Sequence, residues 1–336
     1  MTCVGLVLLI PLFAAQQPVI DEQCLLEQLK IAPAAKTVGE IRTLCTEKLD
    51  AVDTREVDIN EAETDDQGIV EQRIAADRKA IVSPFSILAH KPNYFLFGAY
   101  NAKGWDSTGY RKQTGDMDYS NQDVEGQFQI SLKVPLALDL FGGRFDIYGA
   151  YTNRSFWQMY NRENSEPFRE TNHEPEVWFQ FENNWQVLGF TNVVNTLGLV
   201  HQSNGQSGLQ SRSWNRMYAQ FIFEKENFVF SLKPWIWITQ SWSGDDNPDI
   251  TDFLGHGEFR AAWRRNGHVF SVMLRNQIES RFDKGAVEAS WSFPVFDYPY
   301  LKGYVQYFYG YGESLIDYDN NVNRIGIGLS VTDWLD

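Results

Sequence analysis

Short stretches in which apolar and polar residues alternate with a period of two recur through residues 85–336, and they constrain the fold more than any other feature. In segment 217–224 the odd-numbered positions hold Met, Ala, Phe and Phe, whereas Tyr218, Gln220 and Glu224 occupy much of the other face. Segment 228–238 repeats the pattern with apolar residues at its even-numbered positions. Because successive side chains of a strand point to opposite faces, each segment is expected to be a strand with one apolar face.

Alternation alone does not separate a soluble β-sandwich from a membrane barrel. Three features favour the barrel: segments of barrel-strand length recur, aromatic residues gather toward segment ends, and rows rich in Gln, Lys, Arg and Glu suit a lumen. The sequence therefore predicts an all-β fold, a twelve-stranded antiparallel transmembrane β-barrel with a short, partly helical or disordered N-terminal extension. The expected strands are 93–101, 123–135, 144–158, 173–183, 187–203, 211–224, 227–241, 252–264, 267–281, 285–293, 299–312 and 321–332.

The distribution of aromatic residues divides the chain. Phe, Tyr and Trp make up 15% of the 336 residues, yet none occurs between Phe13 and Phe85. We therefore expect residues 85–336 to form the barrel and residues 16–84 to form an acidic periplasmic extension or linker, disordered around 61–66.

An apolar run over residues 4–15 ends in small residues and predicts a signal peptide, 1–15, cleaved near Ala14 or Ala15. The basic residues that usually precede such a run are absent from Met1-Thr2-Cys3. Loss of Cys3 with the signal would leave Cys24 and Cys45, which a disulfide would join in an oxidising periplasm. The alternative is two unpaired structural thiols.

Charge and hydropathy exclude two classes of protein. The net charge is -15 and no cluster of Lys and Arg is present, which argues against nucleic acid as a partner. After residue 20 no segment is apolar for long enough to cross a bilayer as a helix, which excludes a helical membrane protein.

Three side chains of hydrolase type fall within one expected pair of strands. His201 and Ser203 are two residues apart, so on a strand they share a face, and the imidazole can take the hydroxyl proton. Asn215, on the neighbouring strand, can hold the imidazole in the required tautomer. Extending the alternation back from Phe221 places Asn215 in an apolar row, where an unpaired amide is costly and His201 is the natural partner.

Five blocks of residues fall in order from about residue 85 to the end and carry a family resemblance. They are Pro167-Phe168-Arg169-Glu170-Thr171-Asn172, His201-Gln202-Ser203-Asn204-Gly205, Ser211-Arg212-Ser213-Trp214-Asn215-Arg216, Asp245-Asp246-Asn247-Pro248-Asp249-Ile250 and Gly310-Tyr311-Gly312-Glu313-Ser314-Leu315-Ile316-Asp317-Tyr318. In these blocks the body of the chain resembles outer membrane phospholipase A, a family of Gram-negative barrel enzymes. Residues 20–80 carry no motif of that family.

The resemblance implies a calcium-dependent hydrolase of the Gram-negative outer membrane that is active as a homodimer. Its substrates would be the sn-1 and sn-2 acyl esters of phospholipids and lysophospholipids in the outer leaflet. The resemblance assigns Ser203 as the nucleophile, His201 as the base and Asn215 as the orienting residue, all on the outer wall of the barrel.

The resemblance also implies a Ca²⁺ site. Its ligands would be the Ser211 hydroxyl, the Gln206 carbonyl and, from a second subunit, a carbonyl near Ser165 or Glu166. Hard oxygen ligands of this kind suit calcium. The Gly205 amide and a calcium-bound water would then form the oxyanion hole.

The chain departs from the family pattern at two places, and from many outer-membrane barrels at its last residues. The family commonly has Arg where this chain has Gln206, and a backbone ligand tolerates that change. Gly208 replaces an acidic residue that supports calcium binding in the family, so weaker binding is expected. The chain ends at Trp334-Leu335-Asp336, whereas many outer-membrane barrels end on an aromatic residue.

Two alternative functions remain open: a catalytically inactive porin-like or structural barrel, and a soluble serine esterase with a sandwich core. Asp245 to Asp249 lack the spacing and the distal Glu of an EF-hand, and a solvated external turn is the preferred interpretation. Glu313 and Asp317 are expected to be structural or lumenal, because no sequence feature brings them near Ser203.

Overall fold

The computed structural model describes residues 68–81, 86–108, 111, 115, 117–143, 145–164, 166–238, 246–276, 283–296 and 298–336. Gly68–Asp336 forms one compact unit. The expected signal peptide and the Cys24–Cys45 pair lie outside the described residues, so both stay predictions. Of the described helices, none is long and apolar enough to cross a membrane.

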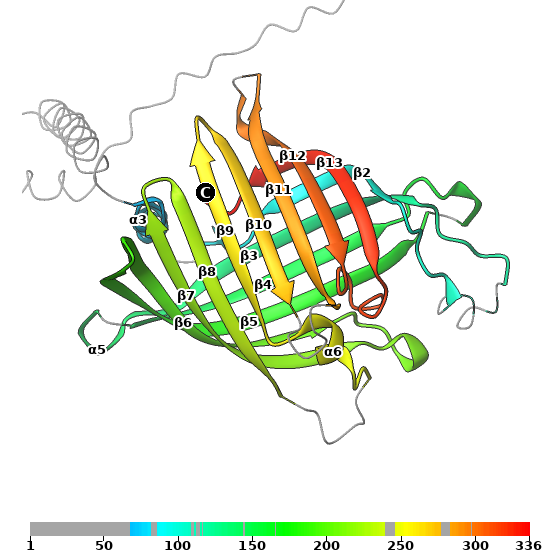
Figure 1. The fold of residues 1–336 in the computed structure, drawn as a ribbon, viewed down its shortest axis with the longest axis horizontal. Coiled ribbons are helices and arrows are strands. Elements are labelled where there is room, and N and C mark those ends of the chain that lie inside the picture. Colours follow the sequence, from blue (N-terminus) through cyan, green and yellow to red (C-terminus); the bar gives the residue numbers. More distant parts are fainter. Residues whose placement is uncertain are drawn as a thin grey trace, which may run out of the picture. The chain divides into compact units, whose positions relative to one another are not determined.

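Twelve strands, β2 to β13, form a closed antiparallel barrel (Figure 1). Each strand pairs with its neighbour in the chain, β13 pairs with β2, and β3 pairs with β4 as well as with β2, so the sheet has no free edge. The bounds are β2 Asn93–Asn101, β3 Val124–Asp139, β4 Phe145–Trp157, β5 Phe168–Val187, β6 Phe190–Ser203, β7 Ser213–Lys225, β8 Phe228–Ile238, β9 Gly257–Arg265, β10 His268–Asn276, β11 Gly285–Val295, β12 Tyr298–Gly310 and β13 Val322–Thr332. The predicted fold class is confirmed.

The two largest differences between expected and observed strand starts have identifiable reasons. β5 begins at Phe168, and its ring stacks on Trp157 of β4 with centroids 5.4 Å apart, so strand pairing extends beyond the expected start at 173. β9 begins at Gly257 because helix α6, Ile250–Leu254, occupies the residues before it. A further two-residue strand, β1 (Leu88–Ala89), pairs with β3.

The barrel wall has one apolar outer face and one polar inner face. Outward side chains such as Phe179, Leu197 and Ile327 are 50%, 50% and 61% exposed although they are large and apolar. Their neighbours of opposite parity, Trp178 and Tyr218 among them, are buried. An apolar surface around a closed barrel is stable against lipid, which agrees with the transmembrane placement expected from the alternation.

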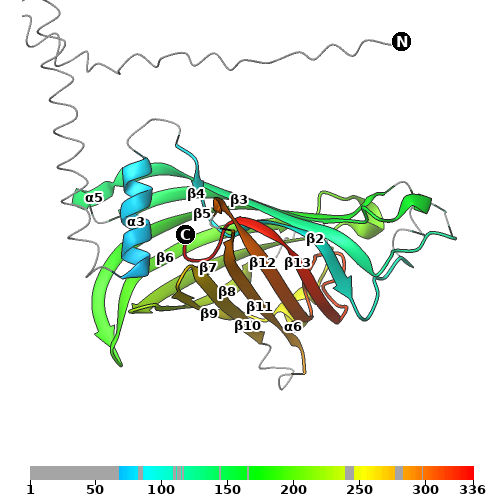
Figure 2. The same cartoon turned by 90° about the horizontal axis from the view of Figure 1, so that it is seen from above.

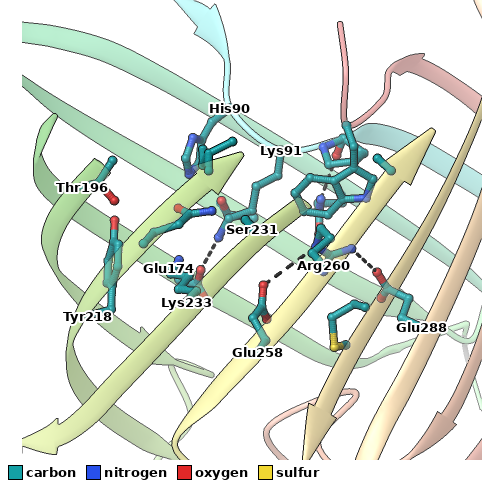
Figure 3. A pocket seen from close by; sticks show the side chains of 18 of the residues that line it. His90, Lys91, Glu174, Thr196, Tyr218, Ser231, Lys233, Glu258, Arg260 and Glu288 are labelled. Carbon is teal, nitrogen blue, oxygen red and sulfur yellow. Dashed lines mark hydrogen bonds and ion pairs between the residues drawn. The ribbon is translucent and has the colours of Figure 1, made fainter. Parts of the chain in front are cut away.

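Paired charges fill the lumen. Arg169 makes two hydrogen bonds of 2.9 Å to the Glu125 carboxylate and also pairs with Asp317, and these side chains are 0–4% exposed. A cavity of about 330 Å³ lies between the strands, and Figure 3 shows Lys233, Glu258 and Arg260 among the side chains that line it. The charges of Arg169, Glu125 and Asp317 are tolerated at this depth because each has a partner of opposite sign.

Helix α3, Ile69–Ala80, closes one end of the lumen. Arg73 donates to the Trp334 carbonyl at 3.0 Å, Asp77 pairs with Lys133 at 2.6 Å, and the Val70 amide donates to Glu224 at 2.7 Å. Figures 1 and 2 show α3 and α6 at opposite ends of the barrel. The compact unit thus includes this helix, although the aromatic distribution had placed the start of the barrel at residue 85.

Candidate active site

The candidate site lies where β6 ends and β7 begins, at the end of the barrel away from α3. In the register of the two strands His201 is opposite Asn215, and Ser203 is opposite Ser213. Leu197 and Leu199, of the same parity as His201, are about half exposed, whereas Val200 is buried. Since side chains alternate along a strand, His201 and Ser203 project from the outer wall.

His201 and Asn215 make direct contact. The Nδ1 atom of His201 lies 2.8 Å from Oδ1 of Asn215. An amide oxygen only accepts hydrogen bonds, so Nδ1 must carry the proton and donate it. The other ring nitrogen, Nε2, then has a free lone pair, which is the state that a general base requires.

Ser203 shares the outer face with His201 because the two residues are separated by one position on β6. Within the described part of the chain, no hydrogen bond engages the Ser203 hydroxyl. The structure therefore brings His201 and Asn215 into contact and places Ser203 in their row. A nucleophile and a base commonly close to hydrogen-bond distance only when substrate binds.

Asn204 organises the turn that follows the nucleophile. Its side chain is buried, and its Oδ1 accepts from the Arg212 amide at 3.0 Å and from the Gln206 amide at 3.3 Å, while its Nδ2 donates to the Gln210 carbonyl at 2.8 Å. Gly205 has φ +65°, a conformation that favours glycine. This role of Asn204 was not predicted from the sequence, although Asn-Gly is a recognisable turn signal.

The expected calcium ligand Ser211 lies beside an acidic residue that sequence analysis did not assign to the site. Its hydroxyl donates to Asp246 Oδ2 at 2.7 Å, and the Ser213 hydroxyl reaches the same oxygen at 3.3 Å. Asp246 belongs to the Asp-Asp-Asn-Pro-Asp segment before α6, which had been interpreted as a solvated turn. The motif was visible, but its proximity to Ser211 depends on the fold.

The other expected calcium ligands are Gln206 and a carbonyl at Ser165 or Glu166. Gln206 is exposed in the turn. Glu166 is exposed in the loop between β4 and β5, and its carbonyl accepts from Trp157 Nε1 at 2.9 Å. Ser165 lies outside the described residues. Among those that are described, no cluster of three or more His, Cys, Asp or Glu side chains forms a metal site, and the expected ligands are mainly hydroxyl and carbonyl oxygens.

Glu313 and Asp317 lie away from this outer face. Glu313 pairs with Arg324 and Asp317 pairs with Arg169, and all four side chains are nearly or fully buried. The Ser314 hydroxyl also donates to Asp317, at 3.2 Å. These ion pairs belong to the polar network inside the barrel, which agrees with the structural or lumenal role expected for Glu313 and Asp317.

A closed barrel with an apolar outer wall that carries a hydroxyl, an imidazole and an amide defines a class of protein, an outer-membrane β-barrel with a hydrolase-type site. The comparisons identify the family within that class. Residues 70–331 match the family model of phospholipase A1. The chain is 34% identical to the phospholipase A1 of Klebsiella pneumoniae over 253 residues, which cover 75% of this chain and 84% of that protein. It therefore belongs to the phospholipase A1 family.

Comparison with solved structures supports the same family assignment. The outer membrane phospholipase A of Escherichia coli superposes with a TM-score of 0.68 at 31% identity and covers 74% of this chain and 100% of its own. The calcium-bound dimer of the Salmonella typhi outer membrane phospholipase gives a TM-score of 0.68 at 32% identity and covers 75% of this chain and 94% of its own. The chain is an outer-membrane ester hydrolase of the phospholipase A1 type from the Gram-negative lineage.

Proposed function

We propose that this protein is a calcium-dependent phospholipase A that uses Ser203, His201 and Asn215 to cleave the sn-1 and sn-2 acyl esters of phospholipids and lysophospholipids in the outer leaflet. One observation carries the assignment: the 2.8 Å contact between His201 Nδ1 and Asn215 Oδ1 on the lipid-facing wall, in the same row as Ser203. A solved Escherichia coli relative is described as an active-site mutant with an asparagine changed to alanine, which supports an active-site role for Asn215.

The residues account for a two-step acyl transfer. His201 Nε2 takes the Ser203 proton as Oγ attacks the ester carbonyl carbon, and it then gives that proton to the departing lysophospholipid oxygen. A water then attacks the acyl-serine and gives its proton to the same nitrogen, and the ring returns that proton to Ser203 Oγ as the bond to the acyl group breaks and the fatty acid leaves. Asn215 keeps the ring in the required tautomer throughout.

The oxyanion formed in each step requires hydrogen-bond donors. The Gly205 amide follows directly after Asn204, whose side chain holds the turn through three backbone hydrogen bonds. A turn held in this way presents its amide without reorganisation at the moment of reaction, which is the condition for effective electrostatic stabilisation.

Calcium fits the oxygen atoms at the site. The Ser211 hydroxyl and the Asp246 carboxylate lie 2.7 Å apart, and both are hard oxygen donors of the kind that Ca²⁺ prefers. We assign these two groups, the Gln206 carbonyl and a carbonyl at Ser165 or Glu166 of a second copy as the residues that would hold it. When bound, the cation would stabilise the oxyanion with its positive charge. This contribution matters because the neutral Asn215 offers no negative charge to stabilise the imidazolium.

A homodimer follows from the same assignment, since one copy would complete the calcium site of the other. The solved Salmonella typhi relative is a dimer with bound calcium. Two barrels that meet at their apolar walls would also form clefts for acyl chains. We expect the monomer to show no phospholipid hydrolysis.

The test is hydrolysis of phospholipid in mixed micelles by refolded full-length protein, with calcium and with excess EGTA. We expect the wild type to require calcium, Ser203→Ala to lose activity by at least about 10³-fold while it remains folded, and the exposed-serine control Ser120→Ala to keep it. A fluorophosphonate probe should label the wild type and not Ser203→Ala. A wild type that is neither labelled nor active would instead support the inactive-barrel alternative.

A further inference from the structure

A second imidazole lies beside the proposed nucleophile. His173 of β5 is the direct register partner of Ser203 of β6. Side chains that are directly opposite in an antiparallel pair have Cβ atoms about 4.5–5.5 Å apart. Val177 and Phe179, of the same parity as His173, are exposed on the outer wall. His173 therefore projects from the same lipid-facing surface as Ser203.

The ring of His173 faces the turn that follows Ser203. A Cβ added to Gly205 would lie 3.7 Å from both Cδ2 and Nε2 of His173. The opposite nitrogen, Nδ1, lies 2.6 Å from the hydroxyl oxygen of Tyr151, a half-exposed side chain on β4. One ring nitrogen is thus engaged by Tyr151, and the other is turned toward Gly205.

A phenol can donate to Nδ1 or accept from it, so the contact with Tyr151 is compatible with both tautomers of the ring. When the phenol donates, the neutral ring carries its proton on Nε2. In that state Nε2 is a hydrogen-bond donor on the side of the ring that is turned toward Gly205. The arrangement is the reverse of that at His201, where Nδ1 donates to Asn215 and Nε2 is the free base. With the proton of His173 on Nε2, the two imidazoles that flank Ser203 have complementary polarity, one accepting a proton and the other offering one.

We propose that His173 is a second oxyanion donor for the reaction, with its Nε2–H bonded to the ester carbonyl oxygen as negative charge develops there. Tyr151 is then a positioning residue that holds the donor tautomer. The inference rests on the proposed function of Ser203, and it adds a side-chain donor to the Gly205 amide. Loss of one such donor typically lowers kcat by about 10²–10³-fold.

The experiment uses refolded full-length protein in phospholipid mixed micelles with calcium and measures kcat and KM separately. His173→Phe keeps a flat ring without a donor, and we expect kcat to fall about 100-fold with little change in KM. His173→Gln restores an N–H donor and should recover most of that loss. Tyr151→Phe should lower kcat by a smaller factor, because the ring then samples both tautomers.

His268 provides a matched control. It also faces outward and contacts an aromatic side chain, with the Trp291 indole donating to its Nδ1 at 3.2 Å, but it starts β10 at the end of the barrel near α3. We expect His268→Phe to behave as the wild type. Chemical cross-linking of each variant in the same micelles measures the homodimer. Unchanged kcat in His173→Phe would overturn the proposal, as would an equal loss of kcat in His173→Gln accompanied by loss of the dimer.

Failure of the proposed function would look different. Fluorophosphonate labelling of Ser203 and hydrolysis by the wild type are measured in the same preparations. A labelled, active wild type with an equally active His173→Phe variant rejects only the role of His173. A wild type that is neither labelled nor active rejects the hydrolase assignment and the role of His173 with it.

Discussion

The lumen and the outer wall of this barrel both carry polar side chains, but the two sets differ in how completely their hydrogen-bonding groups are paired. Inside, Arg169 bonds Glu125 through two nitrogens and pairs with Asp317, so the charges satisfy one another. On the outer wall the Ser203 hydroxyl has no hydrogen bond among the described residues, and His201 uses only one ring nitrogen. Unfilled hydrogen-bonding capacity against lipid is costly, and it is retained where a substrate must supply the missing partner.

The comparison teaches how to tell a structural polar group from a functional one in a membrane barrel. Burial and charge do not decide, because the most buried charges here are structural. The outer site is distinguished by neighbouring hydrogen-bond donors and acceptors that lack protein partners on the side that faces the lipid. Mutations in the two regions should therefore affect different quantities, stability for the lumen and turnover for the outer wall.

The largest effect should come from the lumen. Arg169→Met leaves Glu125 and Asp317 without their cation, and breaking a buried pair in this way typically costs about 3–5 kcal/mol. We expect a lower urea midpoint for unfolding of the refolded barrel, with unchanged turnover per folded molecule. The exposed Arg265→Met is the control. Loss of turnover at unchanged stability would contradict the division between the two regions.

On the outer wall, Asp246→Asn removes the carboxylate charge next to Ser211. We expect apparent calcium affinity to fall by about 10- to 100-fold, with activity restored at high calcium, as is typical when a supporting oxygen group at a metal site is changed. Calcium titration of hydrolysis measures the shift, and the exposed Asp319→Asn serves as the control. An identical titration curve for Asp246→Asn would remove this residue from the proposed site.

A smaller effect is expected at the orienting amide. Asn215→Ala removes one neutral hydrogen bond to His201, worth about 1 kcal/mol, so kcat should fall about 5-fold while the barrel stays folded. Steady-state hydrolysis in mixed micelles measures it, with the exposed Asn227→Ala as the control. A variant as inactive as Ser203→Ala would show that the amide does more than orient the ring.

A further effect concerns pH and the end of the lumen where α3 lies. Burial lowers the pKa of His90 to about 4, helped by Lys91 and Lys133, and this outweighs the opposing attraction of Glu176. Between pH 6.5 and 4 the unfolded chain binds a proton that the folded chain does not, so stability should fall as pH drops through this window. His90→Gln should flatten the dependence of the urea midpoint on pH, whereas His268→Gln should leave it unchanged.

Much of the barrel could be predicted because strand alternation is local. A period of two assigns each side chain to a face without knowledge of its neighbours, so all twelve strands and the shared face of His201 and Ser203 followed from the residues. The row of Asn215 followed in the same way. Its pairing with His201 was expected from the cost of an unpaired amide in an apolar row, and the register of β6 and β7 brings the two side chains into contact.

Other features depended on contacts between residues far apart in the chain. Asp246 meets Ser211, His173 lies opposite Ser203, and helix α3 enters the lumen through bonds to Lys133 and Glu224. No local sequence pattern predicts these long-range contacts, because the closed barrel as a whole sets the strand register and the path of the loops. The sequence by itself determined which face each side chain takes; the tertiary structure decided which side chains meet there, since closure selects one set of neighbours from many.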